Sequence, residues 1–119
     1  MQRQETDMGA RSNLGEFEQL VLLAVLQLDR EAYGPGISGL LEEALDRRIS
    51  RGALYSALAR LEEKGFLRWS VEAASSERGG NRNRRFEVTA DGLETLRAAR
   101  AAMMMLSEGL EAKLGEVDQ

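Results

Sequence analysis

The segment from Arg51 to Leu67, RGALYSALARLEEKGFL, restricts the fold of this chain more than any other part of its sequence. Apolar residues recur in it at spacings of three and four, which predicts a helix, and Gly65 stands where such a helix commonly ends. Ser50 is the expected N-cap. The residues expected to face the core are Leu54, Ala57, Leu58 and Leu61. The opposite face is polar, carries Arg51, Tyr55 and Ser56, and the chain then passes directly into a strand.

Two helical segments precede this one, and an alternating segment follows it. Residues 14–28 are apolar on nearly every side, so this helix needs cover on both faces, and we expect one cover to come from another subunit. A turn then leads, with Pro35 at the first helical position, into a second helix that ends near Arg47. Residues 67–72 and 85–88 alternate between apolar and polar types, as the strands of a hairpin do, and Trp69 is expected to cover the core. This order predicts a mainly α fold with a small β-hairpin wing, the winged helix-turn-helix.

A last helix is expected from Ala90, with Thr89 as its cap, to about Leu114. Its apolar residues keep a heptad-like spacing beyond the length that a small core could use, which is typical of a helix that pairs with a second copy. We therefore expect a flexible N-terminal arm at residues 1–13, a winged helix-turn-helix domain at 14–89, and a C-terminal dimerisation helix and tail at 90–119. The predicted dimer contacts are Leu22, Leu26, Leu96, Ala99, Met103, Leu106 and Leu110.

The composition argues against an enzyme. Histidine and cysteine are absent from the 119 residues, which removes imidazole bases, thiol nucleophiles, disulfides and most transition-metal sites. No pair of carboxylates lies in an apolar segment, so a small carboxylate enzyme is the least favoured class. No segment resembles a secretory signal or a bilayer span, and a cytoplasmic location is expected. The prediction is a protein without enzymatic activity, metal site or cofactor.

The charge of the chain is unevenly distributed. Although the net charge is −4, ten basic and four acidic residues between Arg47 and Arg85 give that region a charge of +6, which leaves −10 for the rest. Such segregation suits a protein that presents one face to phosphate groups. The positive charge is densest in residues 77–85, ERGGNRNRR, a loop whose arginines suit a narrow minor groove. The predicted DNA-binding residues are Ser50, Arg51, Tyr55, Ser56, Arg78, Arg82, Arg84 and Arg85.

Other interpretations stay open at this stage. The polar helix face and the basic loop could both be solvated surfaces, and a winged-helix adaptor for another protein would share the fold without specific DNA contacts. The density of positive charge favours DNA, because an adaptor has no need of it. The run Met103–Met105 is more typical of interface filling, although methionine surfaces also accept small molecules.

Three segments, in order, resemble the PadR family of transcriptional regulators, over Leu14 to about Leu96. They are the apolar first helix that leads to Tyr33-Gly34, the stretch GALYSALARLEEKGF (Gly52–Phe66) and the stretch RRFEVTADG (Arg84–Gly92). The resemblance implies a dimeric repressor whose C-terminal helix pairs with that of its partner, a near-palindromic operator in double-stranded DNA, and release by a small molecule. It also implies groove contacts from Arg51, Tyr55 and Ser56, and wing contacts from Arg82, Arg84 and Arg85.

Overall fold

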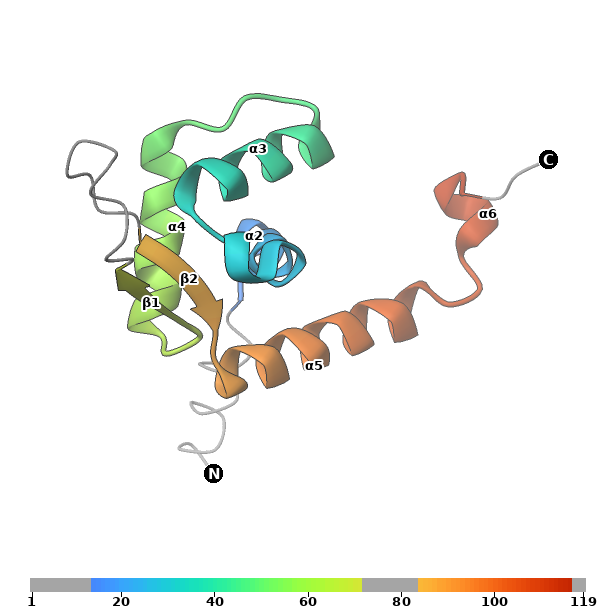
Figure 1. The fold of residues 1–119 in the computed structure, drawn as a ribbon. Helices are drawn as coiled ribbons and strands as arrows, with labels where there is room; N and C mark the ends of the chain where they lie inside the picture. Colours follow the sequence, from blue (N-terminus) through green and yellow to red (C-terminus); the bar gives the residue numbers. More distant parts are fainter. Residues whose placement is uncertain (1–13, 72–83, 117–119) are drawn as a thin grey trace.

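A computed structural model of the chain describes residues 14–71 and 84–116, and Figure 1 shows how the elements are arranged. In chain order these elements are α2 (Glu16–Leu28), the short 3₁₀ helix η1 (Asp29–Glu31), α3 (Gly34–Leu45), α4 (Arg51–Glu63), β1 (Leu67–Val71), β2 (Arg84–Val88), α5 (Ala90–Ser107) and α6 (Glu111–Leu114). The fold is mainly helical, with a two-stranded antiparallel hairpin and a long C-terminal helix, as the sequence predicted. Within the described ranges, no helix is long and apolar enough to cross a membrane.

Helix α2 lies at the centre of the molecule and is covered by other parts of the same chain. It contacts α3, α4, β2 and the start of α5, and Val21, Leu22, Ala24 and Val25 are all buried. The predicted inner face of α4 is confirmed, since Leu54, Ala57, Leu58 and Leu61 are buried against it. The expectation that α2 needs a second subunit to cover both faces was therefore wrong for most of the helix, because three neighbouring elements and α5 already surround it.

Two predicted dimer contacts belong to this core instead. Leu22 has no exposed surface, and Leu96 in the first turns of α5 is only 2% exposed. A side chain that its own subunit already buries has no surface left to offer to a partner. The remaining predicted contacts lie at or near the surface, and Leu106 is the most open of them, at 75% exposed.

The hairpin packs against the helical core at one end only. Its register pairs Leu67 with Val88 and Trp69 with Phe86. Tyr33 and Arg85 form an antiparallel β-bridge, and the Phe86 amide donates to the Ala32 carbonyl at 2.9 Å. The residues just before α3 therefore pair with the outer edge of β2. Leu67 and Phe86 are buried, whereas Trp69, the cross-strand partner of Phe86, is 38% exposed. The prediction that Trp69 covers the core was wrong.

The start of α5 is fastened to the end of α4 by residues that we call the joint: Gly65, Phe66, Thr89 and Gly92. The Thr89 hydroxyl accepts a hydrogen bond from the Gly92 amide at 3.0 Å, which confirms it as the N-cap, and donates to the Gly65 carbonyl at 2.7 Å. The Thr89 amide donates to the Phe66 carbonyl at 3.1 Å. A Cβ atom at Gly92 would lie 2.2 Å from that same carbonyl oxygen, so only glycine permits this close approach.

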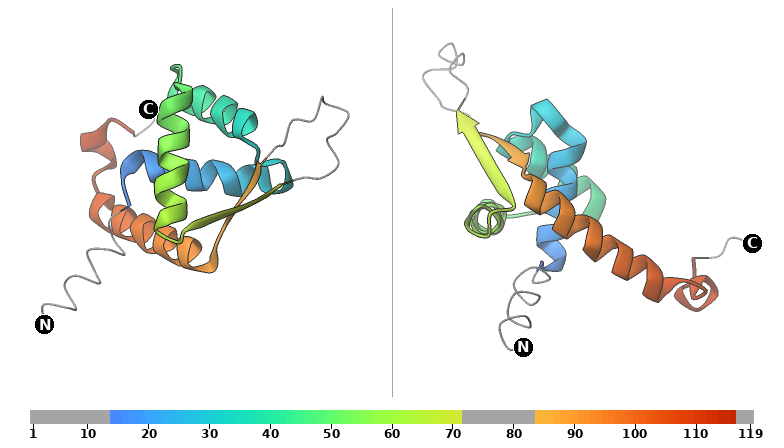
Figure 2. Two further views of the ribbon diagram at one scale, coloured as in Figure 1. Left: turned by 90° about the vertical axis from the view of Figure 1, so that its left-hand side faces the viewer. Right: turned by 90° about the horizontal axis from the view of Figure 1, so that it is seen from below.

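Beyond the joint, α5 extends away from the body of the molecule (Figures 1 and 2). The expected single helix to Leu114 was wrong. Helix α5 ends at Ser107, because Glu108 is extended and Gly109 adopts a left-handed φ of 82°, after which α6 forms one short turn. We call residues 101–114 the distal segment. Met103, Met104, Met105 and Leu106 lie in it side by side along the chain, and all four are exposed.

Candidate nucleic-acid interface

The N-terminal turn of α4 is fixed by its cap and leaves its polar side chains at the surface. The Ser50 hydroxyl oxygen accepts from the Ala53 amide at 3.0 Å, which confirms the predicted N-cap and still leaves the hydroxyl hydrogen available to an acceptor. The Ile49 amide, in the turn before it, donates to a Glu42 carboxylate oxygen at 2.8 Å. Arg51 and Ser56 are both exposed on the outer face of the helix.

Tyr55 lies between the outer face of α4 and the core, half-buried against the apolar cluster. The guanidinium carbon of Arg51 lies 5.5 Å from the centre of its ring, and that of Arg84 lies 6.0 Å away. Its hydroxyl occupies the space that a side chain at position 34 would need, since a Cβ atom at Gly34 would lie 2.1 Å from that oxygen. The absence of a side chain at Gly34, the first residue of α3, thus leaves room for Tyr55, whose ring faces two cations.

The hairpin contacts α4 at a second place, through Trp69 in the middle of β1. The Trp69 indole nitrogen donates to a Glu62 carboxylate oxygen at 2.9 Å, and the Arg84 guanidinium carbon lies 4.9 Å from the centre of the Trp69 ring. Neighbouring Arg68 forms an exposed ion pair with Glu87 at 3.1 Å across the two strands. Aromatic and charged side chains therefore join the hairpin to the helix that carries Arg51.

A buried carboxylate, which the sequence reasoning missed, fixes the other side of α4. Glu18 on α2 accepts hydrogen bonds from Arg60 and Lys64, both at 2.9 Å, and from the Gly15 amide at 2.8 Å. Burial alone would raise the pKa of Glu18, but hydrogen bonds from Lys64, Gly15 and Arg60 outweigh it and hold that pKa below its usual value. The local signal was present, because a Glu three residues after an N-cap is a common capping arrangement.

The predicted DNA-binding residues separate into three groups. Around the N-terminal half of α4 and the first residue of β2, the structure brings together Ser50, Arg51, Tyr55, Ser56 and Arg84. Arg85 follows Arg84 on the opposite face of the strand and is half-buried beside Tyr33. Arg78 and Arg82 lie outside the described residues.

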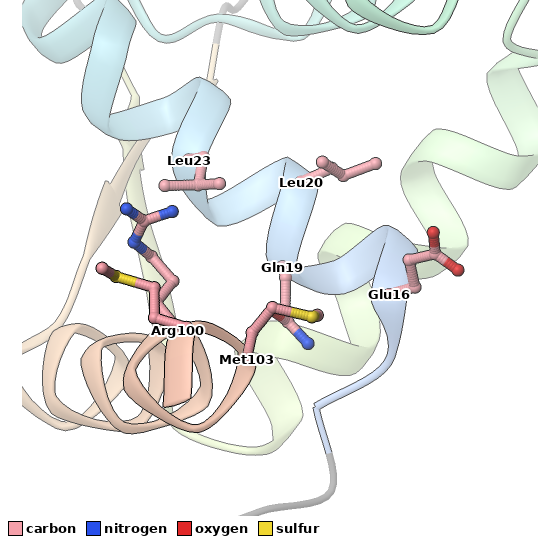
Figure 3. A pocket seen from close by; sticks show the side chains of 7 residues that line it. Glu16, Gln19, Leu20, Leu23, Arg100 and Met103 are labelled. Carbon is pink, nitrogen blue, oxygen red and sulfur yellow. The ribbon is translucent and has the colours of Figure 1, made fainter. Parts of the chain in front are cut away.

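A separate groove of about 490 Å³ lies between α2 and α5. Its walls are mostly apolar, with Leu20 and Leu23 on α2 and two methionines, Met103 and Met104, on α5. Arg100 extends from α5 toward Leu23, as Figure 3 shows. In the part of the chain that the structure describes, no cluster of acidic side chains could hold a metal ion.

A trihelical core whose third helix exposes a polar face, with a hairpin joined to that helix, defines the winged helix-turn-helix class of DNA-binding proteins. Within this class, residues 22–98 match the model of the PadR-like family of transcriptional regulators. The chain belongs to that family, which is DNA-binding and non-enzymatic.

Solved structures agree with this assignment. A PadR-like transcription factor from Bacteroides fragilis has a TM-score of 0.66 and 23% identity, with 92% of this chain and 97% of that chain covered. A PadR family regulator from Eggerthella lenta has a TM-score of 0.61 and 28% identity, covering 97% and 93% of the two chains. A transcriptional regulator from Clostridium thermocellum has a TM-score of 0.62 and 21% identity, covering 80% and 89%. A comparison with curated proteins gave no match.

Proposed function

We propose that the protein is a homodimeric repressor that binds a near-palindromic operator and is released from it by a small molecule. The observation that supports this most directly is the exposure of Ser50, Arg51 and Ser56 on the outer face of α4, next to the start of β2. Side chains in the first turns of such a helix reach the edges of base pairs in the major groove. Arg51 matches the paired acceptors of guanine, and the hydroxyls of Ser50 and Ser56 match phosphate or base edges.

The hairpin supplies the second set of contacts in this proposal. Arg85 on β2, with Arg78 and Arg82 of the connecting residues, would bind phosphate groups next to the groove that α4 enters. The net charge of the chain is −4, but the segment from Arg47 to Arg85 is strongly positive. This segment should therefore provide most of the electrostatic attraction to DNA. An adaptor for another protein would need neither feature, so it stays the second interpretation.

The exposed apolar residues support the dimer. The proposed contacts are those dimer contacts predicted from the sequence that lie at or near the surface: Leu26, Ala99, Met103, Leu106 and Leu110. Four consecutive exposed apolar side chains in the distal segment, Met103 to Leu106, offer apolar surface that a partner subunit could cover. The groove between α2 and α5 is large enough for a small effector, and its position next to the proposed dimer surface would let a ligand alter the distance between two subunits.

Selection of bound fragments from random duplex DNA, followed by sequencing, tests the function directly. A two-fold dimer with its reading helices about 34 Å apart should select inverted half-sites centred roughly ten base pairs, or further whole turns, apart. Replacing Arg51 with Ala should then weaken operator binding by about 1–3 kcal/mol and change random-duplex binding much less. Equal losses on both would make Arg51 a phosphate contact, and failure to enrich any sequence would favour the adaptor.

Phosphate contacts are tested by salt. With Arg82, Arg84 and Arg85 of both subunits near the backbone, the log–log slope of affinity against salt should be on the order of −4 to −6. The triple Ala variant should flatten this slope and weaken operator and random DNA alike. A slope that stays the same in the variant would place the phosphate contacts elsewhere.

A further inference from the structure

We propose that Arg84 is a positioning residue, which locks the hairpin to α4 so that both meet DNA as one rigid unit. This inference rests on the proposed function and assigns Arg84 a second role, in addition to the proposed phosphate contact. Arg84 precedes Phe86 by two residues on β2, and Phe86 pairs with Trp69 on β1. Arg84 and Trp69 therefore share one face of the hairpin as diagonal neighbours, a relation in which long side chains reach one another.

The guanidinium of Arg84 contacts rings from two different elements. Its central carbon lies 4.9 Å from the centre of the Trp69 ring on β1 and 6.0 Å from that of Tyr55 on α4. Both distances fall within the range of cation–π attraction, and the planar guanidinium stacks on aromatic faces better than an ammonium group does. One side chain thus bridges the hairpin and the helix.

Trp69 and Tyr55 are themselves held in place. The indole nitrogen of Trp69 donates to Glu62 at 2.9 Å, near the C-terminal end of α4. Tyr55 lies seven residues earlier, about two turns along the same helix. The hairpin is therefore attached to α4 at two separated points, which opposes rotation of one against the other.

The contacts that Arg84 makes with Trp69 and Tyr55, which we call the lock, also orient Arg51. Its guanidinium lies 5.5 Å from the centre of the Tyr55 ring, so Arg51 and Arg84 share one aromatic partner. Tyr55 packs against the core, and Gly34 leaves the room that its hydroxyl needs, since a Cβ atom there would clash with it. A substitution that keeps the charge of Arg84 should therefore affect base reading through Tyr55 while the phosphate contact of residue 84 is kept.

Arg68 offers a matched control, since it is an exposed arginine next to Trp69 on β1, faces the other side of the hairpin, and is not among the proposed DNA contacts. The test compares Arg84→Lys with Arg68→Lys, because lysine keeps the charge that a phosphate contact or an ion pair needs but not the stacking plane. The free proteins and the selected operator are the samples. Operator and random-duplex affinities are measured, together with the emission of Trp69, the single tryptophan of the chain.

The positioning role predicts that Arg84→Lys shifts Trp69 emission in the free protein and weakens operator binding about fivefold, with random duplex changed less than twofold. Arg68→Lys should keep wild-type emission and both affinities within about twofold, because its exposed pair with Glu87 needs only a positive charge. Wild-type emission and operator affinity in Arg84→Lys would overturn the proposal, as would equal losses on operator and random DNA. If the wild-type protein selects no operator, the proposed function fails separately, and unchanged Trp69 emission in free Arg84→Lys would still overturn the lock.

Discussion

Two surface regions of this molecule are built in opposite ways. In the reading unit, which comprises α4 and the hairpin, charged and aromatic side chains hold one another, as the contacts among Glu62, Trp69 and Arg84 show. In the distal segment, consecutive apolar side chains from Met103 to Leu106 face solvent in the described structure. The comparison teaches that the first region is organised by contacts within a single subunit, whereas the apolar side chains of the second are left exposed by their own subunit. Substitutions in the two regions should therefore affect different measurements.

The largest effect is expected from Leu106→Glu in the distal segment. A two-fold dimer would bury two such carboxylates, neither paired with a cation, so dimerisation should become less favourable by about 4–5 kcal/mol. Light scattering at micromolar concentration should show a dimer for wild type and a monomer for the variant. Leu93→Glu is the matched control, since Leu93 is an exposed leucine on the same helix outside the proposed contacts. A monomeric wild-type protein would contradict the proposed dimer.

Gly92→Ala tests the joint between the two regions. The new methyl group would press on the Phe66 carbonyl oxygen, a backbone atom that cannot rotate away, and should lower the free energy of unfolding by roughly 3 kcal/mol. Gly39→Ala is the control, because Gly39 has open space around it in α3 and should gain about 0.5–1 kcal/mol from the better helix former. Urea unfolding measures both, and equal stabilities of the two variants would show that the backbone at the joint shifts at little cost in free energy.

Glu18→Gln tests the internal support of the reading unit. Losing the charge that Arg60 and Lys64 share should lower the free energy of unfolding at pH 7 by roughly 2 kcal/mol. Because the pKa of Glu18 is lowered in the folded state, its contribution is present above the unfolded value of 4.5 and is lost as pH falls through the folded value. The difference between wild type and variant should therefore shrink below pH 4.5.

The exposed pair of Arg68 and Glu87 supplies the control for this experiment. Glu87→Gln should change the free energy of unfolding by less than about 0.5 kcal/mol, because solvent screens the pair. If Glu18→Gln and Glu87→Gln gave the same small change at pH 7, the buried carboxylate would not stabilise the position of α4.

The smallest effect is expected from Ser50→Ala, which removes the N-cap of α4. Loss of the bond to the Ala53 amide should lower the free energy of unfolding by about 1 kcal/mol. Ser56→Ala is the control, because Ser56 is exposed within the same helix and should leave stability nearly unchanged. Thermal unfolding distinguishes the two, and equal melting temperatures would mean that the cap does not stabilise the helix.

Local signals explain what the sequence could predict. Ser50 and Thr89 cap the helices that follow them through bonds that span three residues, so a short window of sequence contains both partners. The buried face of α4 follows from helical spacing alone. Glu18 was missed because its partners lie 42 and 46 residues further along the chain. The contact of Arg84 with Trp69 likewise depends on the hairpin register, which the alternation of residues does not define.

Two errors came from treating apolar surface as a sign of a partner. Leu22 was assigned to a dimer because α2 is apolar on nearly all sides, yet α2 is the central helix that its own chain surrounds. The predicted end of α5 followed a heptad-like spacing across Gly109, whose left-handed conformation separates α5 from α6. In both cases the tertiary arrangement, rather than local pattern, decided the outcome.

Because α5 is anchored at the joint around Gly92, a small change of its angle there displaces its far end. With 18 residues, the helix is about 27 Å long, and a tilt of about 5° at its anchored end would move its far end by roughly 2 Å. In a dimer joined at the far ends, that angle would govern the span between the two reading helices. A substitution at the joint could then change the preferred distance between half-sites while every residue that touches a base stays the same.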